Sequence, residues 1–490
     1  MIIYIRNHDF HYETECLCRL FFPNDKLVIS KEEIDEDLDE YVYTELCKDK
    51  DKTSFNVKVK LDGIIKEDHL ELNISECSSQ RECEIELEAL LFKVLSSITG
   101  IKPPWGILTG IRPVKLLKSV AEEKGFEEAK DYFLNKFLVS KEKLDLAIKT
   151  MDEEENILKL SRNDSFSLYV SIPFCPSRCS YCSFVSQDID HAKKLIPQYV
   201  IKLLDEIKYT AGIVKKLNLR LETIYMGGGT PTILEAEQLQ VIIETIKSSF
   251  DLSHLREFTV EAGRPDTISK EKLEVLKKLG VDRISINPQA LDDQVLENIS
   301  RKHTSKEVID AYNMARDLGF SNINMDLIAG LTGQSCESFN RSLLKVCSLK
   351  PDSITIHTLS MKKASAITGQ GKKLESSEAL KVAKMLDFAQ EFLFKEGYVP
   401  YYLYRQSRMA GNLENVGWAK PSKQGLYNVY TMDETHTILS CGATGVSKLK
   451  NPNTGKIERI FNYKFPYEYI NGFDEIINRK NRVVSFYEEL

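Results

Sequence analysis

The stretch SFSLYVSIPFCPSRCSYCSF, residues 165–184, begins as an apolar, β-rich run and ends as a loop with three cysteines. Similar β-rich runs recur downstream, each followed by a helical stretch, at 221–227, 257–262, 281–287, 323–330 and 353–360. Repeated βα units predict a parallel sheet covered by helices. About six such units predict an α/β fold of the partial (β/α)6 TIM-like barrel kind, whose chemistry lies at the carboxyl ends of the strands.

Outside this repeat the sequence changes character. Alternating apolar and polar residues, followed by one helical segment that should stop at Gly100, predict a small α+β module. The next part has two helical segments, about 114–136 and 140–160, and the last is aromatic and glycine-rich, as expected of an element that covers the barrel mouth. We therefore divide the chain into an N-terminal module (1–100), a helical connector (101–164), the barrel core (165–375) and a C-terminal cover element (376–490).

Composition narrows the class of protein. The chain has 490 residues, 42% of them hydrophobic, and a net charge of -7, which argues against nucleic acid or an anionic membrane as the main partner. No apolar run approaches the ~20 residues of a membrane helix, and the first residues do not form a signal peptide, so we expect a cytoplasmic protein. Eleven cysteines, an odd number, favour free thiols or metal ligands over disulfides. The eight outside the loop are expected as free thiols: Cys16, Cys18, Cys47, Cys77, Cys83, Cys336, Cys347 and Cys441.

The three loop cysteines, Cys175, Cys179 and Cys182, lie within eight residues directly after a predicted strand. Thiolates select soft metals, among them zinc, Cu(I) and iron–sulfur clusters. A structural zinc site needs four ligands, whereas three thiolates on a cubane of four irons leave one iron open for a small molecule. Spacing alone also allows a zinc loop or three free thiols.

A glycine run ends the second predicted strand. Gly227, Gly228 and Gly229, followed by Thr230, would let the backbone approach a ligand closely and expose N–H donors. The alternative is an ordinary tight turn between strand and helix. The run comes one βα unit after the cysteines, on the same rim, which favours the ligand.

Polar residues mark the later strand ends. Glu261, Gln289 and Asp326 lie at or just after predicted strands, and Arg301 follows the helix after Gln289. Each alone is an ordinary cap or rim residue. Because a charged group at the end of a buried strand needs a partner, four of them around one mouth fit a ligand with hydroxyl, amine and carboxylate groups.

Five motifs together resemble the radical SAM superfamily and, within it, the oxygen-independent coproporphyrinogen III oxidase family. They are YVSIPFCPSRCSYCSF (169–184), YMGGGTPT (225–232), ISINPQAL (284–291), RKHT (301–304) and NMDLIAGL (324–331). The N-terminal module, GILTGIRPVK (106–115) and YYLYRQSRMAGNLENVGWAKP (401–421) resemble the branch called coproporphyrinogen dehydrogenase HemZ.

The resemblance implies a [4Fe–4S] cluster, held by the three cysteines, and S-adenosylmethionine as cofactors. Tyr169 and Tyr181 would flank the cluster and the nucleoside. The other matching positions would contact S-adenosylmethionine: Gly228, Gly229, Thr230, Glu261, Gln289, Arg301 and Asp326. Two departures stand out: Phe184 replaces a fourth cysteine of the oxidases, and Gly411 precedes Asn412 where related heme chaperones carry a His-Asn motif.

The function that the resemblance implies is oxidative decarboxylation of coproporphyrinogen III propionates to vinyl groups in heme biosynthesis. A heme chaperone and another radical enzyme of tetrapyrroles are the alternatives. The expected partners are a tetrapyrrole and an external electron donor such as a flavodoxin or ferredoxin. Four basic residues are candidates for the substrate carboxylates, although solvated surface charges are the simpler interpretation: Arg112, Arg405, Arg408 and Lys420. We assign no catalytic role to His303, His357 or His436.

Overall fold

Two compact units make up the chain. The computed structural model describes residues 1–490 apart from 185–186, 361–375 and 407–408. One unit comprises 1–149, 372–383 and 404–414, and the other comprises 150–371, 384–403 and 415–490. The four-part division expected from the sequence stays a prediction. Within the described residues, every helix is too short or too polar to cross a membrane.

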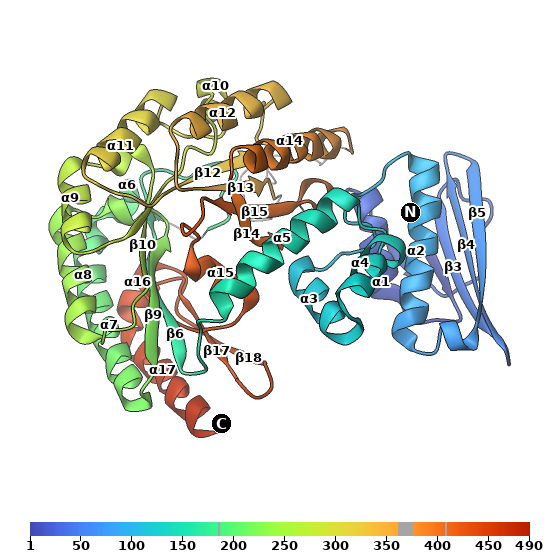
Figure 1. Cartoon of the computed structure of the whole chain (residues 1–490), viewed down its shortest axis with the longest axis horizontal. Coiled ribbons are helices and arrows are strands. Elements are labelled where there is room, and N and C mark those ends of the chain that lie inside the picture. The colour runs from blue at the N-terminus through green and yellow to red at the C-terminus, as the bar shows by residue number, and fades with distance from the viewer. Residues whose placement is uncertain (185–186, 361–375, 407–408) are drawn as a thin grey trace. The chain divides into compact units, whose positions relative to one another are not determined.

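The first unit is built on a five-stranded sheet of order β2-β1-β3-β4-β5 (Figure 1). Its strands are β1 (Ile2–Arg6), β2 (Val28–Ser30), β3 (Tyr41–Lys48), β4 (Lys52–Leu61) and β5 (Ile64–Asn73). Its helices are α1 (His11–Phe21), α2 (Gln80–Thr99), α3 (Pro113–Lys124), α4 (Phe126–Asp131) and the first half of α5 (Lys141–Leu158). Alternate residues of β3 and β4 are buried, as the alternating sequence predicts.

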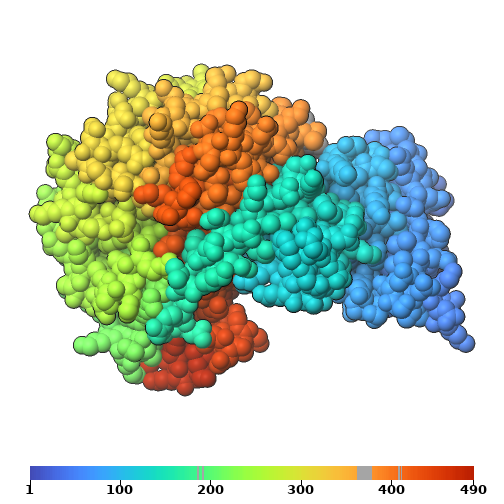
Figure 2. Space-filling model, in the orientation of Figure 1, coloured from blue at the N-terminus to red at the C-terminus, as the bar shows by residue number. Residues whose placement is uncertain are grey.

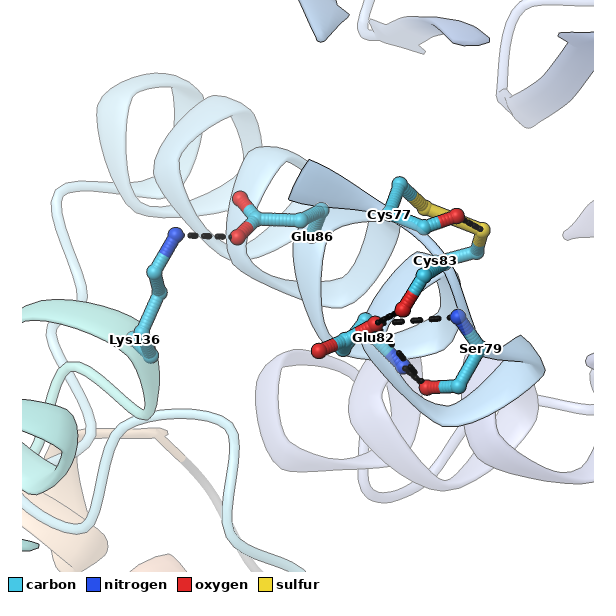
Figure 3. Close-up of a disulfide and its surroundings, with 7 residues drawn as sticks. Cys77, Ser79, Glu82, Cys83, Glu86 and Lys136 are labelled. Atoms are coloured by element: carbon cyan, nitrogen blue, oxygen red, sulfur yellow. Dashed lines mark hydrogen bonds and ion pairs between the residues drawn. A yellow bond between two sulfur atoms is a disulfide. The ribbon is translucent and has the colours of Figure 1, made fainter. Parts of the chain in front are cut away.

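Helix α2 begins and ends where its sequence indicates. The Ser79 side chain caps its first turn together with Glu82, and Gly100 ends it with a φ of 70°. Cys77, just before this helix, forms a disulfide with Cys83 near the start of the helix (Figure 3). The expectation of free thiols was therefore wrong for this pair, because a spacing of six residues says nothing about how a loop folds back on a helix.

The second unit is built on an eleven-stranded sheet of order β14-β15-β13-β12-β11-β10-β9-β6-β16-β17-β18. Its six central strands are parallel and follow the βα repeat: β6 (Ser165–Ile172), β9 (Arg220–Gly228), β10 (Glu257–Gly263), β11 (Arg283–Ile286), β12 (Ile323–Ala329) and β13 (Ser353–Thr358). They curve into the predicted partial barrel (Figure 1). The apolar runs form strands because both of their faces are buried.

Helices cover the outer face of this sheet. They are α7 (Ile196–Leu217), α8 (Ala236–Ser249), α9 (Lys270–Lys278), α10 (Asp293–Asn298), α11 (Ser305–Asp317) and α12 (Cys336–Ser348). In Figure 2 the green-to-yellow part of the chain forms one continuous surface. Ser269 caps α9, and Gly280 and Gly319 follow α9 and α11 with positive φ, as expected. The helix expected at 114–136 is broken at Gly125, whose φ is 94°.

The C-terminal part of the chain adds strands to both edges of the barrel sheet. Beyond β13 lie β15 (Glu414–Ala419), which is antiparallel to it, and β14 (Val399–Arg405). Beyond β6 lies β16 (Thr437–Cys441), which is parallel to it, followed by β17 (Val446–Lys450) and β18 (Ile457–Phe461). The remaining helices are α14 (Ser376–Lys395), α15 (Leu426–Asp433), α16 (Pro466–Asn471) and α17 (Phe473–Glu488). This part therefore widens the sheet, whereas the sequence predicts only a cover.

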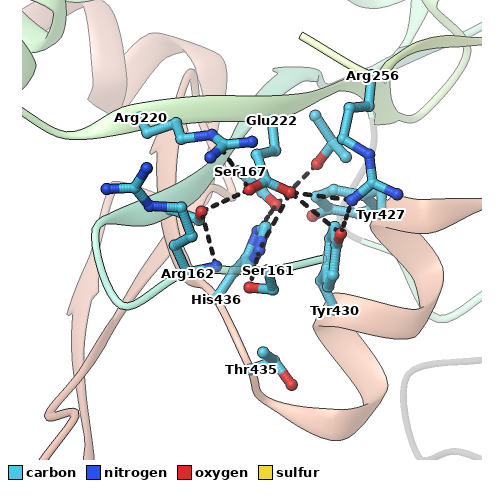
Figure 4. A network of polar contacts seen from close by, with 12 residues as sticks. Ser161, Arg162, Ser167, Arg220, Glu222, Arg256, Tyr427, Tyr430, Thr435 and His436 are labelled. Atoms are coloured by element: carbon cyan, nitrogen blue, oxygen red, sulfur yellow. Dashed lines mark hydrogen bonds and ion pairs between the residues drawn. The ribbon is translucent and has the colours of Figure 1, made fainter. Parts of the chain in front are cut away.

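Helix α15 lies against the amino ends of the barrel strands, opposite the expected mouth. Glu222, at the start of β9, is fully buried and accepts hydrogen bonds from Ser165 Oγ (2.5 Å), Arg256 Nη1 (3.2 Å) and Tyr430 Oη (3.1 Å) (Figure 4). The ring of His436 stacks on Tyr430, and burial lowers the pKa of His436 to about 3. This neutral histidine adds no charge, so the positive charge beside the carboxylate comes from Arg256 and from Arg220, whose Nε lies 3.5 Å from Glu222 Oε1.

Candidate active site

The cysteine loop follows β6 at the carboxyl end of the sheet. Cys175 belongs to β7 (Phe174–Cys175), which pairs with β8 (Gln187–Asp188) at the far end of the loop. Between them the backbone N–H of Cys182 donates to Cys179 O (3.1 Å), and Ser180 N donates to Ile299 O (3.1 Å) behind α10. These hydrogen bonds therefore hold the loop at the carboxyl end of the sheet, where the βα repeat predicts the active site.

The three thiols are close enough to influence one another electrostatically. Burial raises the pKa of the Cys182 thiol, and the nearby thiols of Cys179 and Cys175 raise it further. Cys175 Sγ is 3.6 Å from Thr230 Oγ1. No group of three His, Cys, Asp or Glu side chains in the described ranges converges as the ligands of one metal ion. Each thiolate of an iron–sulfur cluster binds its own iron atom, and a loop with three thiols is chemically suited to this.

The glycine run lies directly beside this loop. Gly229 N donates to Ile172 O (2.8 Å), and Thr230 N donates to Phe174 O (2.8 Å). A Cβ at Gly229 would lie 2.4 Å from Phe174 O and 3.0 Å from Cys175 Sγ. The expectation of an exposed donor was wrong for Gly229, whose N–H binds the end of β6. The N–H of Thr230 binds β7, the strand that carries Cys175. Because Gly229 has no side chain, the glycine run and the cysteine loop can lie in close contact.

Two carboxylates, Glu261 on β10 and Asp326 on β12, lie on the two strands that flank β11. Tyr225 donates a hydrogen bond of 2.5 Å to Glu261, and burial raises the pKa of Glu261 to about 7 despite this bond. Asp326 accepts a bond of 2.7 Å from Asn324 Nδ2, and its Oδ2 lies 3.8 Å from His357 Nε2. Burial alone would raise the pKa of Asp326, but its contacts, His357 first, hold that pKa below its ordinary value.

Gln289 and Arg301 bring unpartnered polar atoms to the same region. Gln289 has a φ of 65°, its N–H donates to Asp326 O, and its buried Oε1 has no partner among the described residues. Arg301 donates to Asn287 O (2.8 Å) and Tyr181 Oη (3.0 Å), while its Nε is buried without a partner in that same part of the chain. Buried polar atoms of this kind are normally satisfied, so these fit a polar ligand.

The two tyrosines predicted beside the cofactors occupy different places. Tyr181 lies in the cysteine loop, bonded to Arg301 and packed against the apolar cluster around α10. Tyr169 lies in β6, where its ring stacks with those of Tyr225 and Tyr427 at centroid distances of 6.1 Å. The structure therefore brings Tyr181 to the cysteines and Tyr169 to a tyrosine stack next to Glu261.

Sequence reasoning missed Arg264, which is 3% exposed and bonds both Ser177 and Asp266. The signal was available, because Arg264 is a charged residue directly after the predicted strand 257–262, in which Glu261 lies. His303 was noted without a role; it is buried, and neither ring nitrogen has a partner among the described residues. Burial lowers the pKa of His303 to about 4, so the ring is neutral.

The basic residues considered for substrate carboxylates behave differently from either expectation. Arg405 is 2% exposed; it donates to Leu108 O (2.7 Å) and Asn412 O (3.0 Å) and lies over the Trp105 ring. It is thus neither a solvated charge nor free for a substrate. Lys420 donates to the carbonyl of Glu396 and lies over the ring of Tyr398.

The other two candidates for binding substrate carboxylates are Arg112 and Arg408. Arg112 directly precedes α3, and its carbonyl accepts a bond from Leu116 N. Arg408 lies outside the described residues.

Comparison with known proteins identifies the family. The model of the Radical SAM superfamily matches residues 169–346. The oxygen-independent coproporphyrinogen-III oxidase-like protein HemZ of Bacillus subtilis (strain 168) is 36% identical over 483 residues, covering 97% of this chain and 96% of that protein. The heme chaperone HemW of the same organism is 40% identical over 197 residues, covering 39% of this chain and half (50%) of the chaperone.

Among solved structures, coproporphyrinogen III oxidase (HemN) from Escherichia coli matches with a TM-score of 0.49 and 22% identity, over 65% of this chain and 72% of that chain. Radical SAM proteins use a [4Fe–4S] cluster and S-adenosylmethionine, and the cysteine loop and the unpartnered polar atoms fit these groups. With a HemZ relative matched along almost its whole length, the chain belongs to the HemZ-like oxygen-independent coproporphyrinogen III oxidase family of the radical SAM superfamily.

Proposed function

We propose that this protein oxidatively decarboxylates the propionate side chains of coproporphyrinogen III to vinyl groups. The observation that carries the proposal is the cysteine loop at the carboxyl end of the barrel, next to the buried unpartnered atoms of Gln289 and Arg301. The match to a HemZ protein along nearly the whole chain supports the tetrapyrrole class of substrate.

The residues of this chain would act as holders and orienting groups. Cys175, Cys179 and Cys182 would bind three irons and leave the fourth open for the amino and carboxylate groups of S-adenosylmethionine. When bound, the two cofactors supply a 5′-deoxyadenosyl radical that takes a hydrogen atom from a propionate. Each converted propionate then loses carbon dioxide and gives one electron to an acceptor.

The polar residues at the strand ends would bind the nucleoside and the methionine portion of S-adenosylmethionine. Arg301 would bring its unpartnered Nε to a carboxylate, since a guanidinium and a carboxylate form strong charge-assisted bonds. Glu261 and Asp326 would accept bonds from hydroxyl or ammonium groups, with Gln289 between them. Gly228 donates its N–H to Glu261, a bond that lowers the pKa of this carboxyl group and partly offsets the effect of burial.

The test is anaerobic reconstitution with iron and sulfide, followed by incubation with coproporphyrinogen III, S-adenosylmethionine and a reductant. We expect products that have lost carbon dioxide and two hydrogens per converted propionate in the mass spectrum. Cys179→Ser should lose both the cluster absorbance and the product, whereas Cys16→Ser, a free thiol in the other unit, should keep both. A fully loaded enzyme that leaves the porphyrinogen unchanged would overturn the proposal.

A heme chaperone is the second candidate, favoured by Phe184 in place of the oxidases' fourth cysteine and by the 40% identity to HemW over 197 residues. Tight, stoichiometric heme binding without porphyrinogen turnover would support it. An external flavodoxin or ferredoxin as electron donor, and a cytoplasmic location, belong to the leading proposal. A methyl gain in the product would indicate another radical reaction on a tetrapyrrole.

A further inference from the structure

Arg264 reaches from the end of β10 to the cysteine loop. Gly263, with a φ of 39°, turns the chain at the strand end, and the side chain of Arg264 is buried there. Its Nε and Nη2 donate to the two oxygens of Asp266, at 3.0 Å and 2.7 Å. This two-pronged contact fixes the plane of the guanidinium.

The remaining nitrogen of Arg264 faces the loop. Nη1 donates to Ser177 Oγ at 2.8 Å and to Ser177 O at 3.2 Å, and it lies 3.9 Å from Cys179 Sγ. Three loop atoms thus meet one buried cation, whose only ion pair in the described ranges is with Asp266. Cys179 is itself buried, so water screens this interaction little.

A cation next to a ligating sulfur changes the energy of electron transfer. Reduction adds one negative charge to a [4Fe–4S] cluster, from the 2+ to the 1+ core, with the electron coming from the reductant. Hydrogen bonds to the ligating sulfurs and nearby charge set the reduction potential of such clusters. Arginine stays charged even when buried, so this influence persists at every physiological pH.

We propose that Arg264 is a positioning residue that fixes the Cys179 segment of the loop and raises the reduction potential of the cluster bound there. The proposal rests on the cluster ligation given under the proposed function, and it is independent of the substrate. It assigns to Asp266 the opposite electrostatic effect, because the carboxylate offsets part of the arginine charge.

The test is a redox titration with dithionite, monitored by electron paramagnetic resonance of the reconstituted protein without substrate. Arg264→Gln should make reduction at a fixed potential about tenfold less favourable, which is a fall of about 59 mV for one electron. Asp266→Asn should shift the potential upward. Arg341→Gln, an exposed arginine on α12 with a side chain 68% accessible, is the control and should shift nothing.

The two variants are expected to shift the reduction potential in opposite directions. This difference separates an electrostatic effect from damage to the loop, which would not produce opposite shifts. Shifts of both variants in one direction, or an unchanged potential in fully loaded Arg264→Gln, would overturn the proposal. If Arg264→Gln binds no iron, the Asp266→Asn result decides alone, and a potential that is unchanged or lower refutes it. Potentials that shift as expected in a protein without decarboxylase activity would refute the proposed function only, whereas a natural chain that takes up no iron refutes both.

Discussion

At the scale of single residues, Gly229 has no room for a side chain, because a Cβ there would lie 2.4 Å from Phe174 O. We expect Gly229→Ala to push the cysteine loop aside and to lower the iron content after reconstitution, as measured by iron and sulfide analysis. Gly212→Ala is the matched control: it lies within α7 with no atom within 4 Å of the added Cβ, so alanine should stabilise by about 0.5–1 kcal/mol. Full iron content in Gly229→Ala would contradict the close approach.

Glu88 is a second residue with a measurable consequence. It is 8% exposed in α2, and burial raises its pKa to about 8 from 4.5. The folded state therefore holds the proton more tightly than the unfolded chain, and stability falls as the pH rises from about 4.5 through about 8. Glu88→Gln should remove this fall.

The gain of Glu88→Gln in free energy of unfolding should be on the order of 5 kcal/mol at about pH 9 and close to zero at about pH 4, at about 1.4 kcal/mol per pKa unit. Thermal unfolding at the two pH values measures it. Glu127→Gln, whose side chain is 81% exposed in the same unit, serves as control and should change stability by less than about 0.5 kcal/mol. A gain that is equal at both pH values would show that ionisation is not the cause.

At the scale of elements, the buried carboxylate of Glu222 joins α15 to β6, β9 and the residue before β10. Glu222→Gln keeps the size but removes the charge next to Arg256 and Arg220. We expect a loss of about 3 kcal/mol, since removing one partner of a buried ion pair leaves charge uncompensated. Urea unfolding measures this loss. Glu274→Gln breaks a pair with Lys270 whose side chains are 52% and 64% exposed, and it should cost less than about 0.5 kcal/mol. Equal losses would contradict a special role for Glu222.

The elements also show how far sequence reasoning reaches. The six barrel strands could be predicted, since each is an apolar run between helices with clear stops such as Gly280 and Gly319. The pairings of β15 with β13 and of β16 with β6 could not, because the partners are distant in sequence and no local pattern identifies them. Likewise the motifs placed Cys179 and Arg301 in one region, whereas the bond from Arg264 depends on a turn at Gly263 that only the fold reveals.

At the scale of the whole molecule, the thiols divide into two classes. Cys77 and Cys83 are joined, and the other nine cysteines are free. Alkylation of the denatured apoprotein, purified anaerobically without reductant, should therefore label nine sites by intact mass, and eleven after reduction. Labelling of eleven sites before reduction would show that the pair stays open in solution.

The pairing of β16 with β6 has a consequence for how the protein is made. A ribosome releases residues 165–172 first, and the neighbour of that strand, residues 437–441, follows only after the other barrel strands β9 to β13. Until then the nascent sheet has a bare edge next to its cysteine-bearing segment, and bare edges invite pairing with other chains. We therefore expect slow translation, or a chaperone bound to the growing chain, to change the yield of folded protein.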